Sequence, residues 1–165
     1  MARQVQGSEG GSQRSAAELP VEEIRSPGQM KVLVDSDVLL DIALDRQPFF
    51  ASSNAALEWC RQHPGSAVMA WHTVANVYYL LRRAETDAVA RKFISELLVF
   101  VAVARSDTRA VLHAFTLRIA DFEDSLQAAA AIFEDAPLIV TRNIRDYRHS
   151  PVLAIEPETL VARYG

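Results

Sequence analysis

Acidic side chains stand at two places where a predicted strand ends or a predicted helix begins. Asp35 directly follows the apolar run 32–34, so a parallel strand would carry its carboxylate to the sheet edge where ligands bind. Asp121 and Asp124 stand three residues apart at the start of a predicted helix, on the same face of its first turn. Asp carboxylates without His or Cys partners favour a hard cation such as Mg²⁺ or Mn²⁺. These acids therefore predict a site for a divalent cation.

Carboxylates that are held close together repel each other unless a cation lies between them. A cation in that position polarises a phosphoryl oxygen and activates water. The residue types therefore predict hydrolysis of a phosphate ester, with Asp35 and Asp124 as catalytic residues and metal ligands, and with Asp121 as a further ligand.

The same acids also have a structural explanation. Asp35 could cap the following helix, although Ser36 or Asp37 could do so instead. Acids in a first turn, such as Asp121 and Asp124, stabilise a helix by a few tenths to about 1 kcal/mol. Small residues follow on the face of Asp124, and they would let the helix pack closely and leave its acidic end in a crevice. That packing favours a functional site.

Polar residues also follow the predicted strand 138–140. Thr141, Asn143 and Asp146 can all point at a site near the end of this strand. We expect Asn143 and Asp146 to contribute metal ligands there.

Basic residues in the same segment form a local patch. Arg142, Arg145 and Arg148 have Tyr147 between them, a pattern suited to a single-stranded backbone and a stacked base. Solvated loop arginines are the simpler explanation of the charges.

Two polar residues elsewhere complete the predicted site. Ser36 follows Asp35, and Asn76 lies on the helix expected over 72–83, where a lone Asn is usually a surface residue. The candidate substrate-binding residues are Ser36, Asn76, Thr141, Arg142 and Arg145.

Strands and helices alternate along the chain. Apolar runs predict strands, helical spacing predicts the segments between them, and this alternation indicates a mostly parallel sheet covered on both faces. The predicted strands are 32–34, 67–70, 99–103, 138–140 and one near 152–153. The helices predicted with both bounds are 38–44, 72–83, 107–118 and 122–133. Three further helices are predicted: one that Pro48 opens and Pro64–Gly65 closes, one that Thr86 or Asp87 caps and that runs to residue 97, and one after Glu156.

Length and composition fit one domain in 165 residues. Residues 1–29 are rich in Gly, Ser, Gln and Glu, and we expect a disordered or loosely attached tail before a domain at 30–165. The single Cys60 cannot form an internal disulfide, and no apolar run reaches the roughly 18–20 residues of a membrane span, so a cytoplasmic protein is expected. The net charge of −4 argues mildly against a nucleic-acid partner.

Taken together, three motifs resemble the PIN-domain family, in particular the VapC-like toxin ribonucleases of bacterial toxin–antitoxin modules. They are Met-Lys-Val-Leu-Val-Asp-Ser-Asp-Val-Leu-Leu-Asp at 30–41, Asp-Phe-Glu-Asp-Ser-Leu-Gln at 121–127 and Ile-Val-Thr-Arg-Asn at 139–143. The similarity covers about residues 30–160.

The resemblance implies a fold, an activity and partners. The fold is a PIN-like three-layer α/β/α sandwich, and the activity is hydrolysis of RNA phosphodiester bonds with Mg²⁺ or Mn²⁺. A cognate antitoxin and a homodimer are also implied. The chain departs from the family at two positions. Many members carry a Glu where this chain has Asn76, and an acid where it has Asn143. Asp121 or Asp146 could supply the missing carboxylate.

Two alternatives stay open from the sequence. One is a non-catalytic PIN-fold module that binds RNA or protein, which the net charge and the two Asn positions favour. The other is a phosphatase similar to haloacid dehalogenases, with Asp35 as nucleophile and Asp37 as general acid. The phosphatase also needs a later lysine and an acidic pair right after a strand, and the predicted domain lacks this arrangement.

Overall fold

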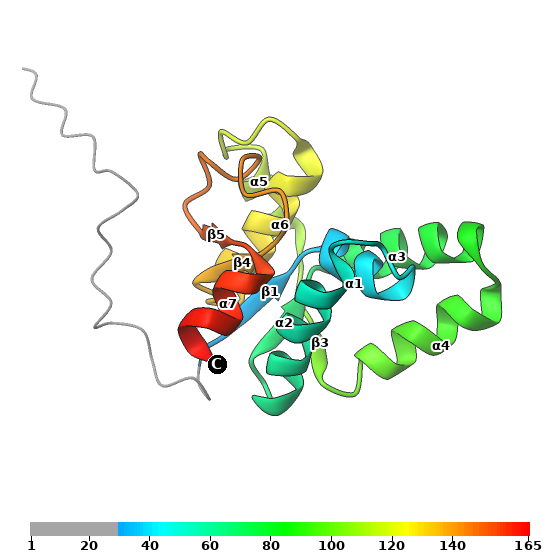
Figure 1. The fold of residues 1–165 in the computed structure, drawn as a ribbon. Coiled ribbons are helices and arrows are strands. Elements are labelled where there is room, and N and C mark those ends of the chain that lie inside the picture. Colours follow the sequence, from blue (N-terminus) through cyan, green and yellow to red (C-terminus); the bar gives the residue numbers. More distant parts are fainter. Residues whose placement is uncertain (1–29) are drawn as a thin grey trace, which may run out of the picture.

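The computed structural model describes residues 30–165, so the predicted N-terminal tail, residues 1–29, lies outside the described residues. Within them, strands and helices alternate as expected (Figure 1). The elements are β1 (Val32–Val34), α1 (Ser36–Ala43), α2 (Phe50–Gln62), β2 (Ala67–Met69), α3 (Trp71–Ala84), α4 (Asp87–Leu97), β3 (Val101–Val103), α5 (Thr108–Ala114), α6 (Phe122–Phe133), β4 (Leu138–Val140), β5 (Leu153–Ile155) and α7 (Pro157–Tyr164).

The five strands form one parallel sheet in the order β3-β2-β1-β4-β5. Strand β1 is central and pairs with β4 so that Val34 lies opposite Val140. The chain builds outward from β1 through β2 to β3, then crosses to the other side of β1 for β4 and β5. The order of the strands therefore reverses between β1 and β4, and a crevice is expected at the carboxyl ends of these two strands.

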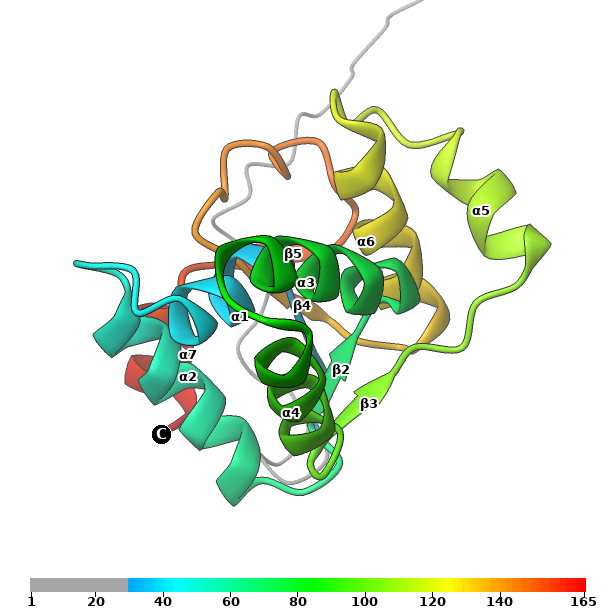
Figure 2. The ribbon, with the colours of Figure 1, turned by 90° about the vertical axis from the view of Figure 1, so that its right-hand side faces the viewer.

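Helices cover both faces of the sheet because successive strand residues point to opposite sides. Val32 and Val34 pack with the core formed by α1, α2 and α7, whereas Leu33 packs on the other face with alanines of α6. Figure 2 shows α5 and α6 on one side of the strands and α2 and α7 on the other. The predicted three-layer α/β/α sandwich with a parallel sheet is confirmed.

The bounds of β1, α6 and β4 agree with the sequence-based prediction, and those of α1, β2, α3, β3 and β5 differ from it by one or two residues. The differences at α2 and α5 have a local cause. Helix α2 begins at Phe50 rather than at Pro48, because residues 47–49 form a turn. Helix α5 ends at Ala114 rather than at residue 118. The reason lies in Thr116, whose backbone N–H and hydroxyl both donate to the His113 carbonyl and close the helix early.

Within residues 30–165, no helix combines the length and the apolar character that crossing a bilayer would require.

Candidate active site

Asp35 lies at the carboxyl end of β1, where its backbone N–H donates to the Val140 carbonyl of β4 at 3.0 Å. The residue caps α1, because its Oδ1 accepts from the Ser36 N–H at 2.6 Å and from the Ser36 hydroxyl at 3.2 Å. The Asp35 carboxylate also accepts hydrogen bonds from outside the helix cap. The Gln127 amide donates to Oδ1 at 3.0 Å, and the Tyr147 hydroxyl donates to Oδ2 at 3.3 Å. Asp35 is therefore both a helix cap and part of the crevice between β1 and β4.

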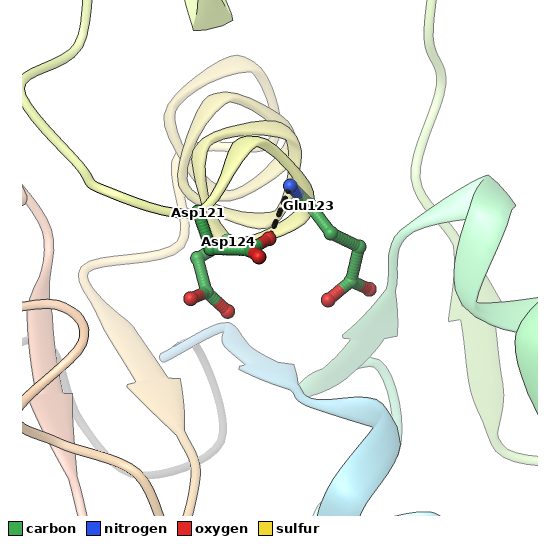
Figure 3. A group of neighbouring side chains, drawn as sticks. All are labelled: Asp121, Glu123 and Asp124. Atoms are coloured by element: carbon green, nitrogen blue, oxygen red, sulfur yellow. Dashed lines mark hydrogen bonds between the residues drawn. The ribbon is translucent and has the colours of Figure 1, made fainter.

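An acidic cluster, which consists of Asp121, Glu123 and Asp124, stands at the start of α6. Each residue offers one carboxylate oxygen, and these oxygens lie within 4.8 Å of one another (Figure 3). Asp121 also caps α6 by accepting from the Glu123 N–H at 2.7 Å. The sequence predicted Asp121 and Asp124 but missed Glu123. The signal was present as three acids within four positions, but their common direction depends on neighbouring elements.

Glu123 is held by side chains from α3 and α6. The Asn76 amide donates to its Oε1 at 3.1 Å, and the Gln127 amide lies 3.3 Å from the same oxygen. The His72 Nε2 lies 3.4 Å from it. Asn76, at the position where many family members were expected to carry a Glu, thus directs a glutamate from another helix into the site.

The acidic cluster lines an open depression of about 510 Å³ on the protein surface. Asp146 reaches the same depression from the loop after β4, so the structure brings together two predicted regions that are far apart in sequence. The lining residues are Asn76, Ala120, Asp121, Glu123, Asp124 and Asp146.

The electrostatics of the site favour a cation. Burial raises the pKa of Asp35, and the charge of Glu123 raises it further. Burial and then the charge of Asp35 raise the pKa of Asp124 to about 6. Converging carboxylates that resist ionisation are the situation that a divalent cation relieves, and an all-oxygen donor set suits Mg²⁺ or Mn²⁺. The residues present therefore fit the predicted metal.

The first three residues after β4, unlike Asp146, gather around Asp37 rather than around the acidic cluster. Its Oδ2 accepts from the Thr141 hydroxyl at 3.3 Å, from the Arg142 N–H at 3.1 Å and from the Asn143 amide at 3.3 Å. Asn143 does not line the depression with the acidic cluster. The metal-ligand role of Asn143 and the substrate-binding role of Thr141 stay predictions.

The comparisons with known proteins assign the chain to a family. The family model described as PIN domain matches residues 31–145, a range that contains Asp35 and the whole acidic cluster. The chain belongs to the PIN-domain family. This family match leaves the phosphatase interpretation without support. None of the curated proteins compared with this chain matches it significantly.

Solved structures agree with the PIN fold. VapBC2 from Rickettsia felis, bound to a DNA fragment from its promoter, aligns with a TM-score of 0.61 at 18% identity, over 77% of this chain and 98% of that chain. VapBC-1 from nontypeable Haemophilus influenzae aligns with a TM-score of 0.60 at 16% identity, over 78% of this chain and 98% of that chain. VapC20 from Mycobacterium tuberculosis, a toxin that cleaves the sarcin–ricin loop, aligns with a TM-score of 0.55 at 13% identity. The alignment covers 66% of this chain and 87% of that chain. At these identities the similarity shows a common fold.

The arginines of the predicted basic patch differ in their exposure in this PIN domain. Arg142 is largely buried, with its Nε 2.9 Å from Asp41 Oδ2, whereas Arg145 is exposed. The prediction that Tyr147 offers a ring for base stacking is wrong. Tyr147 is only 3% exposed and its hydroxyl faces Asp35, because the loop after β4 folds back over the end of β1.

Asp37 gives the PIN domain a testable pH dependence. Burial, and then the charge of Asp35, raise the pKa of Asp37 from 3.8 to about 7. The unfolded chain ionises this group more readily, so the folded state loses stability as the pH rises from about 4 to about 7. An amide oxygen in place of Oδ2 keeps the hydrogen bonds from Thr141, Arg142 and Asn143, so the substitution removes only the charge that faces the Arg142 Nε at 3.7 Å. We expect Asp37→Asn to raise the melting temperature of the metal-free protein by several degrees at pH 8, and much less at pH 4.5. A difference between the two proteins that is constant across this range would contradict the assignment.

Proposed function

We propose that this PIN domain is a metal-dependent endoribonuclease that hydrolyses RNA phosphodiester bonds with Mg²⁺ or Mn²⁺. The convergence of the acidic cluster on α6 with Asp35 at the end of β1 is the observation that carries the proposal. Three acids of one helix turn line an open depression that an RNA backbone can reach, and the buried Asp35 lies outside this lining but is joined to Glu123 through the Gln127 amide.

Asp35, Glu123 and Asp124 would hold the cation, with Asp121 and Asp146 at the rim of the depression. When bound, the cation would neutralise charge on the phosphoryl oxygens and lower the pKa of water. The protein holds its own acids in place for this purpose. Ser36 and Tyr147 fix the orientation of the Asp35 carboxylate through hydrogen bonds, and burial excludes bulk water from it.

The substrate would lie across the depression towards the loop after β4. Asn76, which lines the depression, and the exposed Arg145, which precedes the lining residue Asp146 in the chain, are suited to contact phosphate oxygens. Arg142 would act by fixing this loop, because its guanidinium is engaged with Asp41 and its Cζ lies 4.2 Å from the Phe49 ring centroid.

We also propose a setting for the activity. The fold is shared by VapBC structures, of which the one from Rickettsia felis is bound to a DNA fragment from its promoter. It is also shared by VapC20, a toxin that cleaves the sarcin–ricin loop. By analogy, this chain would be the toxin of a type II toxin–antitoxin module, with a cognate antitoxin and as a cytoplasmic homodimer. A non-catalytic binding module is the second candidate, favoured by the net charge of −4 and by Asn at positions 76 and 143.

The experiment incubates the purified protein with a mixed single-stranded RNA in Mn²⁺, in Mg²⁺ and in EDTA. We expect cleavage that needs the metal and that Asp35→Asn abolishes. Asp45→Asn is the matched control, because Asp45 is an exposed acid in the turn after α1 and has a positive φ that Asn tolerates. Absence of cleavage from a folded sample in both metals would favour the binding module.

A further inference from the structure

Gln127 lies on α6, one helical turn after Glu123, and is completely buried. Its Nε2 lies 3.0 Å from Asp35 Oδ1, 3.0 Å from Thr73 Oγ1 and 3.3 Å from Glu123 Oε1. Its Oε1 is buried and has no hydrogen-bond partner among residues 30–165. The side chain is thus placed between two candidate metal ligands, one from β1 and one from α6.

The orientation of this amide follows from the charges around it. An amide nitrogen carries two hydrogens, so Gln127 can donate to the two carboxylates at once, and it then has no hydrogen left for Thr73 Oγ1. The reversed amide would direct its carbonyl oxygen at Asp35 and Glu123, where it would be repelled. Leaving a buried carbonyl oxygen without a donor is unfavourable, and an apolar side chain of the same size would avoid that cost. A bridge between the two acids explains why an amide occupies this position.

We propose that Gln127 is a positioning residue that joins Asp35 to Glu123 and holds both carboxylates at the separation needed to bind one divalent cation. The inference rests on the proposed function, because it concerns the same cation site. Groups that orient metal ligands without touching the metal contribute about 10–100-fold to metal affinity.

The test measures Mn²⁺ affinity without RNA, by electron paramagnetic resonance of free Mn²⁺. We expect Gln127→Met, which keeps the volume but removes the amide, to weaken Mn²⁺ binding by about 10–100-fold. Thr73→Val is the matched control, because it removes a buried polar group from the same place but leaves both amide hydrogens for the carboxylates. We expect its affinity to stay near that of the parent. Circular dichroism establishes that each variant is folded.

A second measurement needs no substitution. The side-chain amide resonances of Gln127 in the parent protein should shift during a Mg²⁺ titration and stop shifting once the site is saturated. Resonances that stay unmoved, or equal Mn²⁺ affinities for Gln127→Met and the parent, would overturn the positioning role alone. A parent protein that binds no Mn²⁺ would overturn the cation site itself, and with it the proposed function.

Discussion

Asp124→Asn should lower the rate of RNA hydrolysis by about a thousandfold at limiting Mg²⁺. The carboxylate belongs to the acidic cluster, and its pKa is raised to about 6 by burial and by the charge of Asp35. Replacing this ligand by a neutral amide removes several kcal/mol of stabilisation of the charged transition state, and about 1.4 kcal/mol corresponds to a tenfold change in rate. Initial rates of cleavage of a fluorescent RNA across a Mg²⁺ series give the measurement.

Asp121→Asn is the control for this prediction, because it removes the same charge from the same helix turn. The Asp121 carboxylate already caps α6 through the Glu123 N–H, and Asn caps a helix as well as Asp does. We expect this variant to lower the rate of RNA hydrolysis by about tenfold or less, which is the size of a single weak electrostatic contribution. Equal losses in the two variants would mean that the net charge of the turn matters, rather than a specific ligand.

Asp41→Ala should lower the free energy of unfolding by about 3–5 kcal/mol, the usual cost of breaking a buried ion pair. Asp41 is completely buried in α1, and its Oδ2 accepts from the Ser53 hydroxyl at 2.9 Å and lies 2.9 Å from the Arg142 Nε. Without this carboxylate, Arg142 keeps only Asp37, at 3.7 Å, as an acidic partner among the described residues. Urea unfolding at pH 7, followed by circular dichroism, measures the change.

The double variant Asp41→Leu with Arg142→Met tests whether the loss comes from the unpaired charge. A hydrophobic pair of similar volume often replaces a buried ion pair without loss, so most of the stability should return. If the double variant is as unstable as Asp41→Ala, the packing around Ser53 and Phe49 rather than the ion pair would account for the effect.

The sequence by itself determined the elements that have strong local signals. The bounds of β1, α6 and β4 were predicted correctly because short apolar runs and an Asp cap are properties of neighbouring residues. The alternation of strands and helices likewise fixed a parallel sheet, and the position of Asp35 after β1 then placed it at the ligand-binding edge. Helix α5 was predicted too long because the hydrogen bonds of Thr116 to His113 do not appear in an apolar pattern.

Only the tertiary structure decided how the polar groups pair. Glu123 faces the crevice because Asn76 and Gln127 donate to it, and Asn76 lies 47 positions away in the chain. Tyr147 is buried against Asp35, a residue 112 positions earlier, so its ring cannot meet a base. These contacts depend on how α3, α6 and the loop after β4 meet at the end of β1. A sequence pattern reports which face of each element is apolar, but the distances between polar groups on different elements are set only when those faces pack together.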